Sequence, residues 1–562
     1  MTVNNPMAYM KTLLKEKIGQ AYENAVNSAA LDKVELVDFE VEIPKDSANG
    51  EFSSNFAMKN VKLLKKAPVV IANAIVDNFD KGEYVDTITV AGPGFINFKM
   101  ADAYYTMIAD TVLKLSDDYG KTNYFNGQSV LVEFVSANPT GPMHMGNARG
   151  GIIGDCLSAV LSWAGADVKK EFYVNDAGNQ VSLFGLSLYA RLYQLVNGED
   201  SIEFPDDGYH GDDIKILAEA FYDYKNKNVS FDDKDALISD MVAFGLEKNI
   251  ARMEKDLEKY KIYYDKWFRE STLHKSGYVK ETIDLLDKAG ALYEADGAKW
   301  FKATDYGCEK DEVMVKANGF YTYYAVDLAY HRNKFCERNF ERCINVLGAD
   351  HHGHTIRYKA GMRALGIDED RLDVVLMQLV RLMRDGKPFK MSKRTGKSIT
   401  LSDLLDEIPA DAARFFFNMN RSESVMDFDL SLAVKQDTDN PMYYVQYAHA
   451  RICSILRTLE FSGVSETALT NYKFESDAEK ELIRSLSRFP EEISNAAIFM
   501  EPSKITKYVM DVASAFHSFY NACHIKGEQD NVVQGRLALV VCAKTVIKNA
   551  LCLMNIDAPE KM

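Results

Sequence analysis

Residues 129–147 read SVLVEFVSANPTGPMHMGN, an apolar run followed by a loop rich in proline and glycine. The run 129–135 predicts a buried strand. A helix is expected after the loop, because apolar residues recur there with helical spacing at Ile152, Ile153, Cys156, Leu157, Val160 and Leu161. The strand KKEFYV (169–174) and a second helix over 180–196 follow. Strand, helix and strand in this order form a right-handed βαβ unit, which predicts a parallel α/β sheet.

The segment before this unit predicts a separate small domain. Helical periodicity covers residues 6–25, and a second helix-like stretch covers 69–79. The run that follows alternates like two strands around the Gly-Pro-Gly turn signal at 92–94. We therefore expect a small α+β domain over residues 1–120.

The segments after the βαβ unit continue the α/β pattern and then change to helices. After the polar run 435–441 only helical patterns follow, which predicts an all-α domain over 436–562. The α/β domain is therefore expected over 121–435, with an acidic insertion at about 199–260. Further strands of its sheet are predicted at 320–326, 343–348 and 373–380. A chain of 562 residues has room for three domains of this kind.

Composition excludes several classes of protein. Hydrophobic residues make up 47% and charged residues 26%, which is typical of a globular protein and not of a disordered chain. No apolar stretch reaches the roughly 18 residues that a membrane span requires. The N-terminal segment has no apolar signal region. The 8 cysteines are scattered without a C-x-x-C pair, so we expect reduced thiols in a cytoplasmic protein.

Charge is unevenly distributed along the chain. The net charge is -16, and residues 199–260 alone carry 17 acidic and 8 basic side chains. Residues 381–397 carry 7 basic side chains and one acidic one. A basic island in an acidic chain indicates either a solvated face or an anionic ligand. An acidic protein can still bind nucleic acid through one such face.

The loop after the first strand ends in His144-Met-Gly146-Asn147, where a helix is expected to begin. A helix N-terminus offers free backbone N–H groups and a positive dipole end, which attract phosphate. His144 and Asn147 can both donate to phosphoryl oxygens. An ordinary turn with a buried polar histidine explains the same residues, and taken alone this loop favours that interpretation.

A second candidate lies in the basic island, where residues 390–397 read KMSKRTGK. Lysines and hydroxyls in a short loop with glycine suit a polyphosphate, and lysine can act as a mobile charge on a transition state. A solvated basic turn is the alternative, and for an isolated charge run it is the commoner outcome.

Together the two motifs resemble the signature of class I aminoacyl-tRNA synthetases. His144-Met-Gly-Asn147 stands where that class has His-Ile-Gly-His, and residues 390–394 give the full Lys-Met-Ser-Lys-Arg motif. The second histidine of the first motif is Asn147 here, which keeps a donor but lacks the imidazole. The resemblance implies a Rossmann-like catalytic domain over the predicted parallel sheet.

Over essentially the whole chain the resemblance is closest to the arginyl-tRNA synthetase family. The stretches that carry it are VEFVSANPTGPMHMGN, GPGFINF (92–98), GFYTYYAVDLAYHRNKF, INVLGADHHGH and DNPMYYVQYAHARI (439–452). The N-terminal domain would then be the family's additional tRNA-binding domain, and the all-α domain its anticodon-binding domain. The last residues, DAPEKM, resemble the family's usual ending, so we expect a complete C-terminus.

The resemblance implies roles for individual residues. The implied arginine-binding residues are Glu133, Ser136, Asn138, Tyr323, Asp327 and His351. The implied ATP-binding residues are Pro142, His144, Gly146, Asn147, Met391, Ser392 and Lys393, and the catalytic residues are His144, Asn147, Lys390 and Lys393. The implied tRNA-binding residues are Tyr443, Tyr447 and Arg451, with Tyr444 and His449 as further rings that could stack on bases.

Chemistry supports the arginine pocket, although simpler interpretations exist. A guanidinium is a planar five-donor cation that carboxylates and aromatic hydroxyls recognise well. Tyr323 and Asp327 are spaced i, i+4 and share a face if this stretch begins a helix. The alternatives are that Asp327 is an acid on a helix surface and that Tyr323 is a core aromatic residue. The cluster Asp350-His351-His352-Gly-His354 could bind zinc, but no further ligand lies near it in sequence, so we expect no metal site.

The implied reaction has two steps. The arginine carboxylate attacks the α-phosphorus of ATP to give arginyl-adenylate and pyrophosphate, and the 2′-OH of the terminal adenosine of tRNA(Arg) then takes the arginyl group. Mg²⁺ would arrive with ATP and not as a protein-held metal. The expected partners are L-arginine, ATP and tRNA, with no membrane, and the expected state is a monomer. In the family, arginine activation characteristically requires bound tRNA.

Three other functions fit part of the pattern. A non-catalytic synthetase-like protein that only binds tRNA is favoured by Asn147 and disfavoured by the intact 390–394 motif. A class I synthetase for a small apolar amino acid is disfavoured by Tyr323 and Asp327. A nucleotidyltransferase of another kind has no need for an anticodon-type helical domain.

Overall fold

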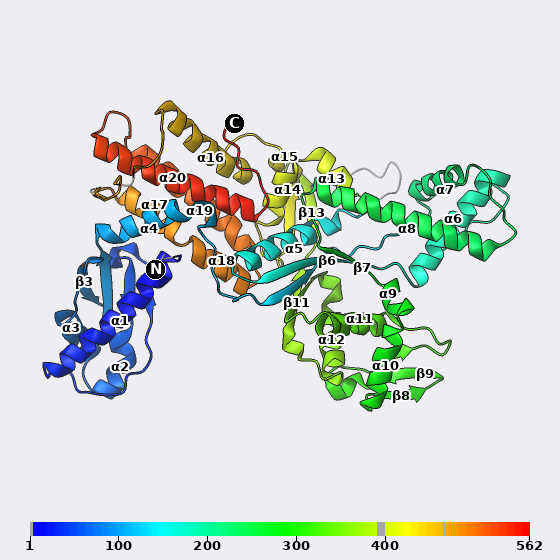
Figure 1. Cartoon of the computed structure of the whole chain (residues 1–562), viewed down its shortest axis with the longest axis horizontal. Coiled ribbons are helices and arrows are strands. Elements are labelled where there is room, and N and C mark those ends of the chain that lie inside the picture. The colour runs from blue at the N-terminus through cyan, green and yellow to red at the C-terminus, as the bar shows by residue number, and fades with distance from the viewer. Residues whose placement is uncertain (1–3, 390–398, 466, 471) are drawn as a thin grey trace.

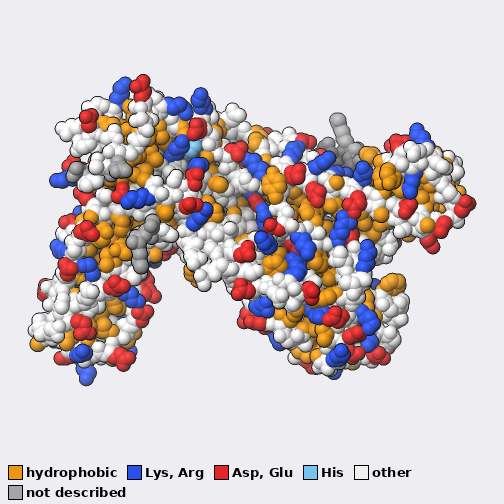
Figure 2. Space-filling view, in the orientation of Figure 1, with side chains coloured by type: hydrophobic (Ala, Val, Ile, Leu, Met, Phe, Trp, Pro, Cys, Tyr) orange, Lys and Arg blue, Asp and Glu red, His pale blue; other side chains and the backbone are white. Residues whose placement is uncertain are grey.

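The computed structural model describes residues 4–389, 399–465, 467–470 and 472–562. A parallel sheet lies at the centre of the molecule, with the N-terminal domain and the C-terminal helices to one side and a helical lobe at the opposite end (Figure 1). In Figure 2, acidic and basic side chains are interspersed over the visible described surface. None of the helices in the described ranges is both long and apolar enough to span a membrane.

The central sheet has five strands in the order β12-β11-β5-β6-β7, and every neighbouring pair is parallel. This confirms the α/β class predicted from the βαβ unit. β5 and β11 lie in the middle of the sheet and are largely buried. The strands are β5 (Ser129–Glu133), β6 (Asp167–Val174), β7 (Lys266–Arg269), β11 (Arg342–Gly348) and β12 (Leu372–Met377).

Helix α5 (Gly146–Trp163) connects β5 to β6 and packs closely on the sheet. A Cβ atom at Gly154 would lie 2.2 Å from Cγ of Phe134, so only glycine allows this approach. A Cβ at Gly151 would lie 2.9 Å from Ile262. The small residues of α5 therefore fix the position of its N-terminus relative to the end of β5.

The strand predicted at 320–326 is wrong, because helix α11 (Tyr323–Arg332) begins inside it. Thr322 has extended backbone, and its hydroxyl accepts a hydrogen bond from the N–H of Ala325, so it caps the helix. Only the residues before this cap are extended, with Tyr321 in a single bridge to Val315. The alternation of aromatic and polar residues indicated a strand, and the threonine cap overrides it.

The predicted strand at 373–380 is divided by a turn. β12 ends at Met377, and β13 (Val380–Arg384) begins a second small sheet of order β14-β13-β15. The other elements of this region are β14 (Lys387–Pro388), β15 (Met426–Asp429), α13 (Leu401–Glu407), α14 (Ala410–Phe417) and α15 (Leu430–Ala433).

Three helices between β6 and β7 form the lobe at the far end of the molecule (Figure 1). They are α6 (Asn179–Asn197), α7 (Asp212–Tyr224) and α8 (Lys234–Lys259). The lobe has an apolar core of its own, which includes Phe184, Leu188, Ile214 and Phe221. Because α6 packs against α7 and α8, the inserted unit begins before the acidic segment at 199.

Helices and short strands that come before and after β11 in the sequence form a further layer. It has its own buried cluster, in which Phe301, Ala325, Leu328 and Met362 are fully buried. The antiparallel sheet of this layer has the order β10-β9-β8. Its elements are α9 (Ser271–Lys275), α10 (Tyr278–Lys288), β8 (Leu292–Ala295), β9 (Ala298–Phe301), β10 (Glu312–Val315), α11 and α12 (His352–Ala364).

The N-terminal domain is an α+β unit, as predicted. Its antiparallel sheet has the order β1-β2-β4-β3, and the hairpin of β3 and β4 turns at the expected Gly-Pro-Gly segment. The elements are α1 (Pro6–Asn27), β1 (Val41–Glu42), β2 (Phe52–Ser54), α2 (Phe56–Leu64), α3 (Pro68–Asp77), β3 (Val85–Ala91), β4 (Phe95–Met100) and α4 (Asp102–Leu115).

The C-terminal part is all-α in its described residues, which confirms the prediction. Helix α4 of the N-terminal domain packs against α17 and α20, and Arg484 of α17 donates to the buried carboxylate of Glu51 at 3.1 Å. The helices are α16 (Pro441–Thr458), α17 (Asp477–Ser487), α18 (Phe489–Ile498), α19 (Ser503–Ala522) and α20 (Asp530–Leu553).

Candidate active site

The chain turns sharply where β5 ends, and this turn builds one wall of the site. Val135 and Ser136 have φ values of 68° and 44°, a left-handed conformation that is unfavourable for a β-branched residue. The Ser136 hydroxyl donates to Oε1 of Glu133 at 3.0 Å and accepts from the N–H of Tyr173 at 3.1 Å. The turn thus joins the ends of β5 and β6 through one hydroxyl.

His144 lies at the N-terminus of α5. The N–H of Gly146 donates to His144 Nδ1 at 2.9 Å, so in the neutral ring the proton lies on Nε2. His144, Pro142 and Gly146 are exposed, and Asn147 is half-buried. This arrangement leaves the Nε2 donor open to an anion at the positive end of an 18-residue helix, whose first amides already donate to His144 and Met145.

The second motif lies outside the described residues, so Lys390, Met391, Ser392 and Lys393 are not placed. The residues on either side of it are placed. Phe389 donates its N–H to Leu382 O at 2.8 Å. After the motif, Ile399 O accepts from Met145 N at 2.9 Å, and Leu401 N donates to Met143 O at 2.9 Å. The chain that follows the second motif therefore pairs with the chain around His144, although more than two hundred residues separate them.

Arg149 fixes the same region from inside the protein, and the sequence analysis missed it. Its side chain is fully buried in α5. It donates to the backbone carbonyls of Gln378 at 3.0 Å, Ser424 at 2.8 Å and Arg421 at 2.7 Å. These bonds hold the segment after β12, from which β13 leads to the second motif.

Two carboxylates, Asp327 and Glu270, lie near each other on neighbouring elements, and Glu270 also lies 3.4 Å from Nε2 of His274. Asp327 of α11 accepts from the Tyr358 hydroxyl at 3.0 Å, and Glu270, just before α9, accepts from the Tyr173 hydroxyl at 2.7 Å. Burial raises the pKa of Asp327 to about 7, and burial likewise raises the pKa of Glu270 to about 7. Among the described residues, neither pairs with a lysine or arginine. A bound cation would favour the ionised form of both.

The other predicted arginine-binding residues surround these acids less closely. Glu133 is buried and accepts from Lys334 Nζ at 2.6 Å. Burial alone would raise the pKa of Glu133, but the Lys334 ammonium lowers it by more. The pKa of Glu133 therefore lies below its usual value. Tyr323 is exposed, and its hydroxyl accepts from Asn175 Nδ2 at 3.3 Å. Asn138 is exposed in the loop after β5.

His351 lies in the turn between β11 and α12. Its Nε2 is 3.5 Å from an oxygen of the exposed Asp350, and its ring centroid is 4.8 Å from that of His354. His354 Nδ1 is in turn 3.1 Å from the Tyr358 hydroxyl. Within the described ranges, no three His, Cys, Asp or Glu side chains form a group that could hold a metal ion.

A spacing signal in the sequence connects Asp327, which was predicted, with His331 and Lys334, which were not. Asp327, His331 and Lys334 follow one another at i, i+4 and i+7, which places three polar residues on one helical face. In the structure His331 and Lys334 are buried, and Asp327 is half-buried. Glu270 and Tyr358 carry no such local signal, because the elements that bring them to Asp327 are distant in sequence.

The predicted tRNA-binding residues lie in one row on α16. The rings of Tyr443 and Tyr447 are nearly parallel, with centroids 6.4 Å apart, and the Tyr447 ring is 6.3 Å from that of His517. Arg451 lies over the ring of Tyr520 at 4.8 Å. Tyr447 is 39% exposed. His449, in contrast, is buried and bonds the carbonyl of Pro559, so it cannot stack on a base.

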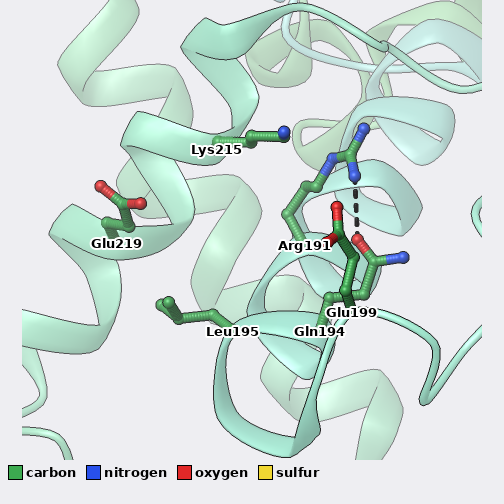
Figure 3. Close-up of a pocket in the computed structure, with 6 residues that line it drawn as sticks. All are labelled: Arg191, Gln194, Leu195, Glu199, Lys215 and Glu219. Carbon is green, nitrogen blue, oxygen red and sulfur yellow. Dashed lines mark hydrogen bonds between the residues drawn. The ribbon is translucent and has the colours of Figure 1, made fainter.

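A separate pocket in the lobe has a mixed lining. Figure 3 shows Arg191 and Lys215 on its walls together with Glu199 and Glu219, and Arg191 donates to Gln194 at 2.9 Å. All of its lining residues come from α6, α7 and the segment between them. It receives no residue from the ends of the parallel strands, where ligands bind in open α/β sheets.

Comparisons with known families cover nearly the whole chain. Residues 110–442 match the family described as tRNA synthetases class I (R), catalytic domain. Residues 11–100 match the arginyl tRNA synthetase N terminal domain. Residues 445–562 match the DALR anticodon binding domain.

Individual relatives agree over full length. The arginine–tRNA ligase of Acetivibrio thermocellus is 49% identical over 566 residues, covering 100% of both chains. That of Ruminiclostridium cellulolyticum is 50% identical over 564 residues, covering 99% of this chain and 100% of the relative. The solved arginyl-tRNA synthetase of Thermus thermophilus has a TM-score of 0.73 at 20% identity, covering 98% of this chain and 100% of that one, which supports the fold alone.

Proposed function

Because the chain belongs to the arginyl-tRNA synthetase family, we propose that it joins L-arginine to tRNA(Arg) in an ATP-dependent reaction. One structural observation carries the proposal. Two carboxylates, the half-buried Asp327 and the buried Glu270, lie near each other, and neither has a lysine or arginine partner among the described residues. A guanidinium would supply the missing positive charge, and its planar donors suit carboxylate oxygens.

Asp327 is the principal partner of the substrate guanidinium in this proposal. Its helix carries it to the pocket, and the Tyr358 hydroxyl orients one of its oxygens. Glu270 adds a second negative charge. Tyr323 and His351 lie at the exposed rim. Glu133, Ser136 and Asn138, at and after the end of β5, bind the α-amino and carboxylate end of the substrate.

The phosphates of ATP bind at the start of α5. His144 Nε2 and the Asn147 side chain donate to them at the positive end of the helix dipole, and Pro142 and Gly146 leave room for the nucleotide. Lys390 and Lys393 stabilise the charge that develops as the arginine carboxylate attacks the α-phosphorus, with Met391 and Ser392 in the same sequence motif. Catalysis then rests on in-line positioning and charge stabilisation, and no covalent enzyme intermediate is required.

Mg²⁺ accompanies ATP in this proposal. The described residues offer no three-ligand cluster, so oxygen ligands come from the phosphates and water, as is common for magnesium with nucleotides. We assign no residue of this chain to the ion.

The tRNA contacts three parts of the chain in this proposal. Tyr443, Tyr447 and Arg451 form an open row in which planar groups can stack on unpaired anticodon bases. The N-terminal domain contacts the body of the tRNA, and the acceptor end reaches the catalytic domain. The acidic segment 199–260 lies away from the tRNA backbone. We also propose that the protein acts as a cytoplasmic monomer.

The test is ATP–pyrophosphate exchange with each of the twenty amino acids, with and without total tRNA. Exchange with arginine alone, dependent on tRNA, is the expected result. Exchange with a different amino acid would retain the fold and overturn the pocket. No exchange with any amino acid would favour a protein that only binds tRNA, and the Asn147→His variant would then be tested first.

A further inference from the structure

A chain of buried hydrogen bonds connects the two acids that face opposite ends of the proposed arginine pocket. Lys334 Nζ donates to Glu133 Oε2 at 2.6 Å and to Asn345 Oδ1 at 3.0 Å. Asn345 Nδ2 lies 2.9 Å from His331 Nε2, and His331 Nδ1 lies 2.7 Å from the backbone carbonyl of Asp327. The chain passes through β5, β11 and α11.

The direction of each bond is determined by chemistry. The carbonyl of Asp327 can only accept, so Nδ1 of His331 carries the proton and its Nε2 accepts from the Asn345 amide. Burial lowers the pKa of His331 to about 3, and the Lys334 charge acts in the same direction. The ring is therefore neutral throughout the physiological range, and the chain has one hydrogen-bond arrangement.

Lys334 is fully satisfied in spite of its burial. Its side chain is 0% exposed, and that of Glu133 is 9% exposed. Two of its three donors bond Glu133 and Asn345, and its ammonium also lies 4.2 Å from the ring centroid of Tyr330. A buried ion pair is costly unless its remaining groups are bonded in this way, and removal of one partner leaves an uncompensated charge.

Local backbone geometry delivers Lys334 to this position. Residues Asn333–Glu337 form a π-helical turn directly after α11. Such turns are rare and occur frequently at functional sites, because they insert one residue and change which side chains face inward. Lys334 is the second residue of this turn.

At its other end, the chain of hydrogen bonds holds Asp327 at two points, the backbone carbonyl and the carboxylate. His331 bonds the Asp327 carbonyl, and its ring packs on Tyr358 with centroids 4.6 Å apart. Tyr358 in turn donates its hydroxyl to the Asp327 carboxylate at 3.0 Å. A shift of His331 would therefore move both the backbone of Asp327 and the hydroxyl that orients it.

We infer that Lys334, Asn345 and His331 are positioning residues that fix the distance between the Glu133 end and the Asp327 end of the arginine pocket. The pocket thereby selects substrates by the length of their side chain. This role rests on the proposed function. One methylene more or less changes the fit of a substrate by only about 10–200-fold even in a well-formed pocket, so a movable wall would lose that discrimination.

The experiment measures aminoacylation of total tRNA with arginine, with homoarginine and with the homologue one methylene shorter. In the Lys334→Met variant, kcat/KM for arginine should fall about 100-fold, because a displacement of about 1 Å has that effect on a positioned substrate. The ratio of kcat/KM for arginine to that for either homologue should fall about tenfold. The KM for ATP should stay unchanged.

The Asn345→Leu variant tests the other half of the chain. It leaves the Lys334–Glu133 pair intact and removes the bonds that join Asn345 to Lys334 and to His331. Because the buried charges remain paired, this variant keeps the proposal testable if Lys334→Met fails to fold. We expect the same loss of length selectivity, with a smaller loss in kcat/KM.

Arg338→Met is the matched control. Arg338, four residues after Lys334, donates to Glu171 at 2.6 Å, and Glu171 is as deeply buried as Lys334. Glu171 lies opposite Glu133 in the β5–β6 pairing, but among the described residues no side-chain hydrogen bond joins this ion pair to Glu133 or Asp327. Its loss should therefore lower thermal stability without changing length selectivity. Equal selectivity in wild type, Lys334→Met and Asn345→Leu would overturn the inference. A wild-type protein that fails to charge tRNA with arginine would instead overturn the proposed function.

Discussion

Asp327 and Glu133 are held by buried partners on several elements, whereas His144 and Gly146 at the start of α5 are exposed and bonded mainly to each other. In the proposed function both regions belong to one site. The difference matches their proposed tasks, since recognition of a side chain requires fixed partners and a phosphate region must let ATP enter and pyrophosphate leave. Variants in the two regions should therefore fail in different ways.

The largest effect is expected from Asp327→Asn. The variant keeps the shape of the side chain and removes the charge that faces the guanidinium. Loss of one partner of a buried charge pair costs about 3–5 kcal/mol, so kcat/KM for arginine should fall about 1,000-fold. Steady-state aminoacylation measures it. Asp350→Asn is the control, because Asp350 is a solvent-exposed carboxylate nearby, and an equal loss there would contradict the assignment.

His144→Ala tests the phosphate side. Removal of one donor to a developing phosphoryl charge costs about 100-fold in kcat. The KM for arginine should change little, because His144 lies outside the acidic pocket. Single-turnover adenylate formation measures the chemical step directly. His210→Ala, an exposed histidine in the lobe, should retain full activity, and a large rise in the arginine KM of His144→Ala would oppose the separation of roles.

The sequence predicted the phosphate side of the proposed site better than the acidic side. The βαβ unit and the helix start at Gly146 were predictable, because they follow from apolar spacing over a few residues. Glu270 and Lys334 were not, because their partners are remote: 201 positions separate Lys334 from Glu133, and 97 separate Glu270 from Tyr173. Pairing over such distances depends on the tertiary fold.

Two local predictions failed for identifiable reasons. The strand expected at 320–326 gave way to α11 because Thr322 caps a helix within an aromatic run. His449 was a candidate for base stacking because it lies among the aromatic residues of the segment 439–452, but the C-terminal segment covers it and its ring bonds the carbonyl of Pro559. The periodicity of the sequence shows neither that a threonine caps a helix within an aromatic run nor that a segment distant in sequence buries a side chain.

Dependence on pH should separate the two regions next. The pKa of Asp327 is raised to about 7, and only its ionised form attracts a guanidinium. The KM for arginine should therefore rise about tenfold as the pH falls from 8 to 6, while the KM for ATP stays nearly level. The dependence should be largely lost in Asp327→Asn. An arginine KM that is independent of pH would contradict the proposed role of the Asp327 charge.

The raised pKa of Asp327 also predicts how the stability of the folded protein depends on pH. A carboxyl whose pKa is raised on folding binds its proton more tightly in the folded protein, so its contribution to stability is lost as pH rises through about 4 to 7. Arginine should offset this loss by favouring the ionised form. Thermal unfolding with and without arginine should show a larger ligand-induced rise in Tm at pH 8 than at pH 6.

The smallest effect is expected at the anticodon side. Tyr447→Ala removes one partly exposed ring from the row on α16. Loss of stacking of about 1 kcal/mol should raise the KM for tRNA about fivefold and leave kcat unchanged. Tyr224→Ala in the lobe is the control, because that ring is also exposed. If both variants raise the tRNA KM equally, the row does not bind the anticodon.

The most direct measurement compares Asp327→Asn and His144→Ala side by side, with KM for arginine, KM for ATP and kcat determined for each. A division of roles predicts that Asp327→Asn raises the arginine KM and spares the ATP KM, whereas His144→Ala lowers kcat and spares the arginine KM. Parallel losses of all three constants in both variants would contradict the account of a rigid arginine pocket beside an open phosphate site.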